Sequence, residues 1–356
     1  MNVRKIGMLV IAITVMASCK KDQMIDDGGI VAPGNYENGY FVTNEGNFGT
    51  GNGSISFVSE NGSVDNDVFA SVNSFPLGDV VQSMNIFGGN AYILVNGSAK
   101  IEVASVDSMY HIATIEGLIS PRYIAKVSGS KAYVTDWGID GVQVVNLTTN
   151  TISSTIPCGA GPEGIVVSDV SPFAYVCNLG GFGLDNTVSV IDIENDVVVS
   201  TLEVGDRPNS VVVDATGAVW VLTGGFTEYD PVTWDIISET AGNLVKIVDN
   251  TIEATYTFAV GNHPEDLVIN DAGTTLYYSD GSWSKAVYAF DISATELPTT
   301  ALINKSFYGL GCANGYVYGT DAIDFTQQGW SFKYATNGTV VDSVQVGIIP
   351  GGYCFN

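Results

Sequence analysis

The fold of this chain is decided by residues 161–213, which read GPEGIVVSDVSPFAYVCNLGGFGLDNTVSVIDIENDVVVSTLEVGDRPNSVVV. Four segments rich in β-branched residues are separated here by Gly, Asn, Asp and Pro, the residues that tight turns favour. The segments predict four short strands at Gly164–Ser168, Ala174–Asn178, Thr187–Ile193 and Val197–Val204. Gly205-Asp206-Arg207-Pro208 then restarts the pattern. A repeating unit of four antiparallel strands is one blade of a β-propeller.

The pattern recurs along the chain wherever Pro or Gly precedes an apolar run that fits an innermost strand. Clear copies begin at Pro121, Pro162, Pro208 and Pro264, and the steps between them are 41, 46 and 56 residues. Four-stranded blades repeat about every 40–45 residues. The longest step therefore predicts an insertion in the blade that begins at Pro208.

Three weaker copies, at Gly78-Asp79, Phe307-Tyr308 and Pro350, bring the number of blades to seven. After Pro350 the chain has room for one strand only, and residues 39–44 fit the strand that should follow it. We therefore expect strands from both ends to share one blade, which closes the ring and leaves no open sheet edge. The predicted fold class is all-β, a seven-bladed propeller with four antiparallel strands per blade.

Two segments resemble the YVTN β-propeller repeats of bacterial surface proteins. One is Phe41-Val42-Thr43-Asn44, and the other is Tyr175-Val176-Cys177-Asn178 together with residues 186–192. The resemblance extends over most of residues 39–356 and implies the propeller fold for that domain. It implies little about function, because propellers host many activities.

Residues 1–18 resemble the signal peptide of a bacterial lipoprotein. Arg4 and Lys5 precede an apolar stretch that is too short to span a bilayer. Residues 16–19, MASC, are similar to the processing box in which the cysteine becomes lipidated, so we expect a lipid on Cys19. An ordinary secretory signal with a chance cysteine is the alternative.

Residues 19–38 are polar and contain glycine, which predicts a flexible, lipidated tether. Their charged residues, close to the lipid, resemble the surface-export signal of some Gram-negative lipoproteins. The expected location is the outer membrane, with a lipid anchor and exposure at the cell surface.

The amino-acid composition limits the classes of molecule that this protein is expected to bind. The net charge is −25, and an acidic surface repels phosphate backbones, so nucleic acid is excluded as an expected partner. Only 14% of residues are charged and 41 are glycine, which suits short strands and tight turns. No segment has a convincing amphipathic helical pattern.

Aromatic residues gather in the predicted loops between second and third strands, although turns favour small polar residues. In a propeller these loops emerge on the same rim as the loops that enter the innermost strands. An aromatic rim predicts a binding face, unless the rings fold back over the blade tops. The rings concerned are Phe48, Trp137, Phe182, Phe226, Tyr229, Trp234, Trp283, Phe325 and Trp330.

The insertion, residues 223–241, is the longest of these loops. Long loops on a rigid scaffold commonly carry specificity. Its acids can meet hydroxyl, amide or cationic groups of a ligand, or they form a solvated acidic excursion. They are Glu228, Asp230, Asp235 and Glu239.

The loops that enter the innermost strands add mixed charge to this rim. They contain Arg122, Glu163, Arg207, Asn209, His263, Glu265 and Asp266. The two guanidinium groups can pair with a phosphate or carboxylate of a ligand. Alternatively, each pairs with an acid of a neighbouring blade.

Catalytic chemistry has little support in the sequence. There are two histidines, His111 and His263, with no metal-ligand spacing and no nucleophile or acid arranged around either. We expect no catalytic residue, metal or cofactor and no enzymatic activity, with metal-assisted hydrolysis of a lactone-type substrate as the alternative. The remaining cysteines are Cys158, Cys177, Cys312 and Cys354, and they form no CxxC pair. An exported protein can form disulfides, but these positions equally suit small buried residues, so we expect free, buried thiols.

Lipidation, an export-like tether and an acidic propeller with an aromatic rim together resemble the surface propeller lipoproteins that capture vitamin B12. The most similar stretch is NEGNFG at residues 44–49, followed by NGSIS at residues 52–56. The resemblance implies that a corrinoid such as cobalamin binds over the channel mouth and passes to a TonB-dependent transporter. A protein- or glycan-binding surface module and a propeller lactonase remain alternatives.

The residues expected to contact the ligand follow from the rim positions. They are Asn47, Phe48, Arg122, Trp137, Glu163, Phe182, Arg207, Phe226, Tyr229, Trp234, His263, Trp283, Phe325 and Trp330.

Overall fold

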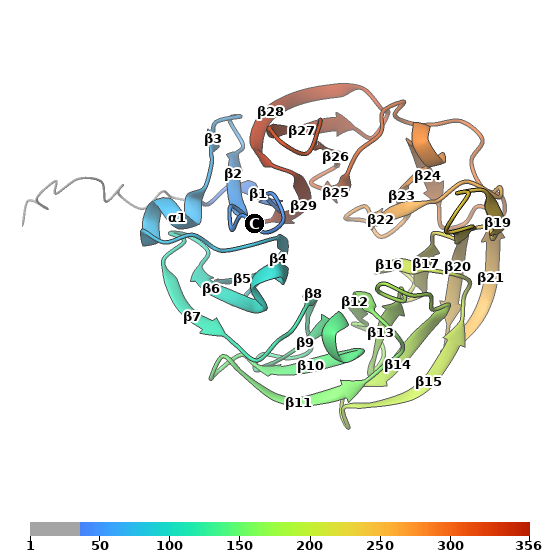
Figure 1. Ribbon diagram of the computed structural model, residues 1–356, viewed down its shortest axis with the longest axis horizontal. Coiled ribbons are helices and arrows are strands. Elements are labelled where there is room, and N and C mark those ends of the chain that lie inside the picture. The colour runs from blue at the N-terminus through green and yellow to red at the C-terminus, as the bar shows by residue number, and fades with distance from the viewer. Residues whose placement is uncertain (1–35) are drawn as a thin grey trace, which may run out of the picture.

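The computed structural model describes residues 36–356, and seven antiparallel sheets surround a central axis in it (Figure 1). The chain is a seven-bladed β-propeller, as the repeats predict. The signal peptide, the lipidation at Cys19 and nearly all of the tether lie outside the described residues. Among residues 36–356, no helix has the length and apolar character needed to cross a bilayer.

The first three complete blades follow one another along the chain, each written from the innermost strand outwards. Blade 1 contains β4 (Val81–Phe87), β5 (Asn90–Val95), β6 (Lys100–Ser105) and β7 (His111–Ile115). Blade 2 contains β8 (Pro121–Lys126), β9 (Lys131–Asp136), β10 (Gly141–Asn146) and β11 (Thr151–Pro157). Blade 3 contains β12 (Pro162–Val167), β13 (Phe173–Asn178), β14 (Thr187–Asp192) and β15 (Val197–Glu203).

The remaining blades complete the ring. Blade 4 contains β16 (Pro208–Val213), β17 (Val219–Thr223), β20 (Asn243–Val248) and β21 (Thr251–Thr257). Blade 5 contains β22 (Glu265–Ile269), β23 (Thr275–Asp280) and β24 (Ala286–Asp291). Blade 6 contains β25 (Gly309–Ala313), β26 (Tyr316–Asp321), β27 (Gln328–Ala335) and β28 (Val340–Ile348). Blade 7 contains β29 (Pro350–Phe355), β1 (Gly39–Asn44), β2 (Ser54–Ser59) and β3 (Val64–Asp65).

Blade 7 joins the two ends of the described chain. β29 pairs antiparallel with β1, so that Phe41 lies opposite Cys354 and Tyr40 opposite Phe355. The predicted closure of the ring by strands from both ends is confirmed.

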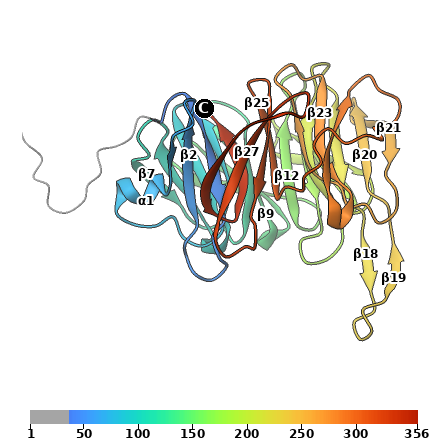
Figure 2. The ribbon, with the colours of Figure 1, turned by 90° about the horizontal axis from the view of Figure 1, so that it is seen from above.

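Three local features add to the predicted pattern. The outer edge of blade 5 is an isolated bridge between Val287 and Ile303. The insertion after β17 folds as a hairpin of β18 (Thr227–Tyr229) and β19 (Ile236–Glu239), which projects beyond the disc (Figure 2). The sequence predicted no helix, but the structure contains α1 (Val68–Asn73), a six-residue helix that buries Val68, Phe69 and Val72. Its apolar positions are too few to show a helical period.

Short 3-10 turns lie between second and third strands of three blades. They are η1 (Asn96–Ser98), η2 (Trp137–Ile139) and η3 (Ser282–Ser284).

Apolar clusters fill the spaces between adjacent blades, and alternate residues of one strand face opposite neighbours. Tyr277 of β23 packs with Leu310 of blade 6, whereas Tyr278 packs with Leu276 and Trp220 on the side of blade 4. Successive side chains of a strand point to opposite faces, so each of these strands packs against the blades on both sides. The apolar core therefore consists of clusters between neighbouring blades, and these clusters support the loops of the channel rim.

The four cysteines within the described residues are free, as predicted. Cys177 and Cys354 are buried as predicted, whereas Cys158 and Cys312 are only half-buried, contrary to the prediction. Burial raises the pKa of both Cys158 and Cys354 to about 12, so these thiols stay protonated at neutral pH.

Candidate functional site

The candidate site lies at one end of the central channel, where the predicted loops converge. A cavity of about 550 Å³, here called the mouth cavity, lies between the loops of blades 2 to 5. A second cavity of about 470 Å³ adjoins it on the side of blades 6, 7 and 1, and Arg122, Tyr123 and Asp266 line both. The two hollows form one wide, polar channel mouth.

The side chains at the bottom of this mouth come from irregularities at the start of the innermost strands. In blades 1 to 5 the pairing register shifts within the first residues of that strand. Such a bulge re-aims side chains that would otherwise alternate between the blade faces. The residues at the shifts form a ring that lines the cavities, here called the bulge ring: Gln82, Arg122, Glu163, Asn209 and Asp266.

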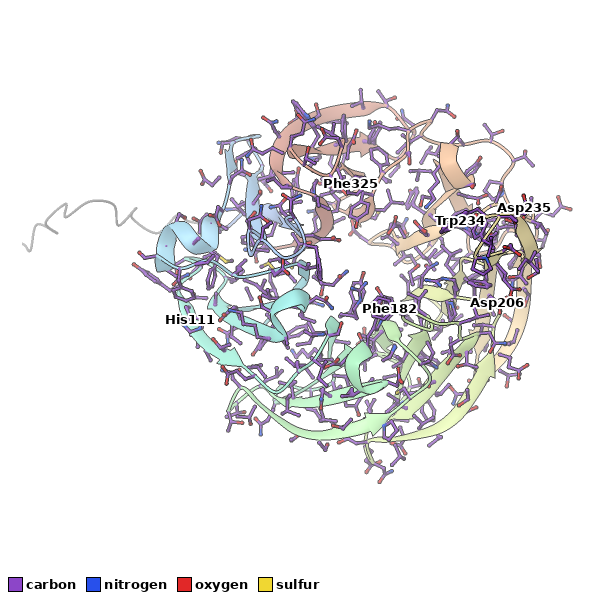
Figure 3. All side chains as sticks on the ribbon, in the orientation of Figure 1. His111, Phe182, Asp206, Trp234, Asp235 and Phe325 are labelled. Carbon is purple, nitrogen blue, oxygen red and sulfur yellow. The ribbon has the colours of Figure 1, made fainter. Side chains whose placement is uncertain are left out.

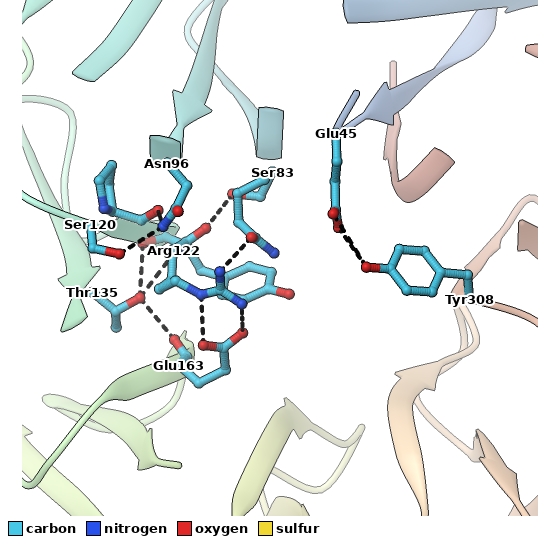
Figure 4. A network of polar contacts seen from close by, with 11 residues as sticks. Glu45, Ser83, Asn96, Ser120, Arg122, Thr135, Glu163 and Tyr308 are labelled. Atoms are coloured by element: carbon cyan, nitrogen blue, oxygen red, sulfur yellow. Dashed lines mark hydrogen bonds and ion pairs between the residues drawn. The ribbon is translucent and has the colours of Figure 1, made fainter. Parts of the chain in front are cut away.

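Arg122 and Glu163 form the strongest contact of the bulge ring (Figure 4). The guanidinium donates from Nε and Nη2 to the two carboxylate oxygens, both at 2.8 Å, and from Nη1 to Gln82 Oε1 at 2.5 Å. Burial alone would lower the pKa of Arg122, but the charge and hydrogen bonds of Glu163 outweigh it and raise the pKa. Arg122 thus links blades 1, 2 and 3, in agreement with the structural alternative considered for it.

Trp137 and Phe182 extend this network onto the rim. The guanidinium carbon of Arg122 lies 4.3 Å from the ring centroid of Trp137, and the ring of Phe182 meets Trp137 edge-on at 5.8 Å. Phe182 is fully exposed and lies beside the central opening (Figure 3). Trp137 is therefore a support, whereas Phe182 presents a free aromatic face.

The second cavity contains an acid and two rings from different blades. Tyr308 donates its hydroxyl to Glu45 at 3.2 Å (Figure 4). The ring of Tyr308 also meets the ring of Phe325 edge-on, with the ring centroids 5.3 Å apart. Burial raises the pKa of Glu45, which the hydrogen bond from Tyr308 and the charge of Arg122 partly offset. Phe48 also lines this cavity and is largely exposed.

Asn47 ties blade 7 to blade 6. Its amide Nδ2 donates to the carbonyl of Phe325 at 2.7 Å, so that this donor is used within the protein. Asn47, which the sequence predicted to bind the ligand, thus also has a structural role in joining two blades.

Asp266 faces the centre of the channel and lines both cavities as well as the channel below them. Its backbone has a φ of 61°, a left-handed conformation that aspartate tolerates better than most residues. Burial raises the pKa of Asp266 to about 7, and the charge of Glu265 adds to the effect. This carboxyl is therefore poised to exchange a proton near neutral pH.

His263 holds the base of the β18–β19 hairpin. Its Nδ1 lies 2.8 Å from the carbonyl of Gly224, and its Nε2 lies 3.1 Å from Thr227 Oγ1 and 3.6 Å from Glu239 Oε1. Thr227 donates to the same Glu239 oxygen at 2.9 Å. Both imidazole nitrogens thus have partners on the hairpin side of the mouth cavity.

The hairpin contributes to the mouth only at its base. Phe226 and Tyr229 line the mouth cavity, while Trp234 is 75% exposed and lies away from it (Figure 3). Trp330 is half-buried in β27, paired opposite Asp321, and lines neither cavity. The side chain of Trp283 lies outside the described part of the molecule.

The structure brings most of the predicted residues to one mouth and adds others that the sequence analysis missed. Those added are Glu45, Gln82, Tyr123 and Tyr308. Gln82 and Tyr123 lie at the start of innermost strands, shortly after the Gly or Pro that marks each repeat. Their positions in the repeat could therefore have predicted that they line the channel mouth. Glu45 and Tyr308 meet across the closed ring, which local pattern does not reveal.

The chemical capacity of the mouth is that of a binding site lined by four carboxyl groups, of which Asp266 has a pKa raised to about 7. Across residues 36–356, no three or more His, Cys, Asp or Glu side chains are grouped so that they could hold a metal ion. Exposed rings can stack on a flat ligand, and the polar groups of the bulge ring can accept and donate hydrogen bonds.

Comparisons with solved structures agree with the fold. A quinonprotein alcohol dehydrogenase-like protein of Bacteroides thetaiotaomicron superposes with a TM-score of 0.67 at 16% identity, covering 90% of this chain and 79% of the other. The periplasmic gluconolactonase PpgL of Pseudomonas aeruginosa gives a TM-score of 0.61 at 12% identity, covering 88% and 98%. At these identities the likeness concerns the fold alone.

Sequence comparisons give the family. The seven-bladed beta-propeller protein Rv1057 of Mycobacterium tuberculosis is 24% identical over 143 residues, which are 39% of this chain. The match spans about a third of that protein, 35% of its length. The model of a family described as a domain of unknown function, DUF5074, matches residues 38–346. The chain therefore belongs to the DUF5074 family of β-propellers.

Proposed function

We propose that this protein binds a corrinoid across the channel mouth and passes it to a TonB-dependent transporter in the outer membrane. The observation that carries the proposal is the pair of adjoining cavities, of about 550 and 470 Å³, at the centre of the rim. A protein- or glycan-binding module would instead present shallow aromatic platforms without a deep central hollow. Cavities of this size are typical of small-molecule sites.

The chemistry of the mouth suits a large, flat ligand with a polar edge. Phe182, Tyr229 and Phe325 expose ring surface around the opening, and such rings favour stacked or edge-on contact with a planar ligand. A corrin is a broad macrocycle that carries amide side chains. The carboxylate of Glu45 and the side chain of Asn209 can meet such amides through hydrogen bonds.

The transporter partner is supported by the projecting hairpin. Val232, Trp234, Ile236 and Ile237 are more than half exposed at its tip. Apolar side chains on a protrusion are typical of surfaces that contact another protein. The resemblance of residues 1–38 to a lipidated, surface-exported leader would place this hairpin beside outer-membrane proteins.

Calorimetric titration of the purified protein tests the ligand. Cyanocobalamin, dicyanocobinamide and a glycan panel would be added in separate runs, and we expect one corrinoid per chain and no heat with glycans. Phe226→Ala combined with Tyr229→Ala should weaken corrinoid binding about 10-fold or more, because both rings line the mouth cavity. Tyr110→Ala removes an exposed ring far from the mouth and is the matched control. No heat with either corrinoid would reject the proposal.

A lactone hydrolase is the second candidate, and Asp266 favours it. A carboxyl with a pKa of about 7 at the centre of a cavity suits a general acid or base. The fold likeness to a gluconolactonase sets the first substrate to try. Turnover of gluconolactone that Asp266→Asn abolishes, with the Glu203→Gln variant on the exposed face of β15 remaining active, would support this candidate over the binding protein. Absence of turnover above the spontaneous rate would reject it.

A further inference from the structure

We propose that Arg207 is an anion-binding subsite of the channel mouth that takes a phosphate group of the ligand. The inference rests on the proposed function, because a cobalamin carries one phosphodiester, in its nucleotide arm, and no carboxylate. Arg207 would then be the residue that distinguishes a complete corrinoid from one without the nucleotide arm.

The guanidinium of Arg207 lacks a charged partner within the described residues. Three basic side chains line the mouth cavity: Arg122, Arg207 and His263. Arg122 pairs with Glu163, and His263 lies 3.6 Å from Glu239. Within residues 36–356, no carboxylate forms an ion pair with Arg207. Arg207 is therefore a cation of the mouth cavity without a carboxylate partner.

The acid next to Arg207 in the chain, Asp206, is engaged elsewhere. Asp206 precedes Arg207 directly, yet its carboxylate accepts a hydrogen bond from Thr240 Oγ1 at 2.6 Å. Its carbonyl accepts from Gly225 N at 3.0 Å. Asp206 therefore anchors the base of the hairpin, and the guanidinium keeps its capacity for an external anion.

Hydrogen bonds on both sides fix the backbone of Arg207. Its N–H donates to the carbonyl of Asp185 at 2.9 Å, and its carbonyl accepts from Gly224 N at 3.0 Å. Its φ of 57° is left-handed, a conformation that arginine adopts only where the surroundings impose it. The loops of blades 3 and 4 thus hold this residue at the cavity wall.

Contacts within the protein use little of the hydrogen-bonding capacity of the Arg207 guanidinium. Its one contact within the described residues is a long one, from Nη1 to the carbonyl of Gly183 at 3.5 Å. Four further N–H donors remain for a ligand. The planar fork matches two oxygens of a phosphate, and such charged hydrogen bonds are about twice as strong as neutral ones.

The test compares two ligands that differ in the phosphate. Calorimetry would measure cyanocobalamin and dicyanocobinamide, which lacks the nucleotide arm, against the wild-type protein, Arg207→Gln and Arg207→Lys. We expect Arg207→Gln to weaken cyanocobalamin about 10- to 100-fold and to leave dicyanocobinamide within about twofold. Arg207→Lys should recover part of the loss, since it keeps the charge without the fork.

Lys246→Gln is the control for net charge, because Lys246 pairs with Glu253 on the outer strands of blade 4 and neither residue lines the cavities of the mouth. This variant should bind both corrinoids as the wild type does. Equal loss of both ligands in Arg207→Gln, or no loss of either, would overturn the subsite and leave the proposed function standing.

A wild-type protein that binds neither corrinoid would overturn the proposed function itself. The subsite would then be tested with inorganic pyrophosphate, by thermal denaturation of the wild type and Arg207→Gln. Stabilisation of the wild type alone supports the subsite independently of corrinoids. Equal response of the two proteins, or none, overturns the subsite as well.

Discussion

Asp136 shows how single residues at the ends of second strands hold the rim. It ends β9, and its buried carboxylate accepts hydrogen bonds from the backbone N–H groups of Ile119 and Ser120 at 2.8 Å and of Gly138 at 2.9 Å. One carboxylate therefore joins the loop that enters blade 2 to the loop that leaves its second strand.

Asp136→Ala should consequently lower the free energy of unfolding by about 2–4 kcal/mol, since it leaves three backbone donors without their acceptor. Urea denaturation measures the change, with Glu203→Ala on the exposed face of β15 as a control that should cost little. A free energy within about 0.5 kcal/mol of the wild type would show that the contact is dispensable.

The raised pKa of Asp266 makes stability depend on pH. The pKa of this carboxyl is about 7 in the folded state and about 4 in the unfolded state. The free energy of unfolding therefore falls as the pH rises from about 4 to about 7, because the folded state holds the proton more tightly. Asp266→Asn removes that penalty. The variant should gain roughly 1–3 kcal/mol relative to the wild type at pH 8 and little at pH 4, as measured by urea denaturation at both pH values. An equal difference at both pH values would contradict the assignment.

At the scale of elements, the β18–β19 hairpin and the blades have different roles. The blades carry the interblade clusters, whereas most of the hairpin tip is exposed, with Val232 at 84% and Trp234 at 75%. An isolated two-stranded hairpin is marginally stable, so its base contacts with Asp206 and His263 hold it in place.

Replacing residues 229–237 with Asn-Gly, which suits a two-residue hairpin turn between Glu228 and Ser238, should keep the midpoint of thermal unfolding within about 2 °C of the wild type. The shortened protein should lose binding to the proposed transporter partner while the blades stay folded. A fall of the unfolding midpoint by more than about 6 °C would mean that the hairpin is part of the core.

At the scale of the whole molecule, stability depends on closure of the ring. Truncation after Ile349 removes β29, leaves the edge of β1 unpaired and takes Cys354 out of the cluster between blades 7 and 1. We expect a loss of about 5 kcal/mol or more in the free energy of unfolding, measured by urea denaturation. The hairpin replacement removes a similar length of chain and is the control. A truncated protein as stable as the wild type would contradict closure.

Repeat patterns predicted the fold because each blade carries its own local signal. The Pro anchors at 121, 162, 208 and 264 marked innermost strands, and residues 39–44 with 350–355 predicted the closure that β1 and β29 make. The rim position of Arg122 followed from the same register.

Other features depend on distances that only the closed ring sets. The pairing of Arg122 with Glu163 and the meeting of Glu45 with Tyr308 join different blades, and local sequence contains no measure of either. The sequence did not predict that residues 227–239 fold as a hairpin. Apolar residues there do not alternate with buried positions, because all four of the following are exposed: Val232, Trp234, Ile236 and Ile237. The candidate site was thus predictable as a rim, and its internal contacts were not.

The most direct measurement of the central claim is a crystal structure of the protein with cyanocobalamin. We predict one corrin over the channel mouth, in contact with Phe226 and Tyr229 and with its phosphate at Arg207. A corrin bound on another face, or a mouth left empty at saturating ligand, would contradict the account.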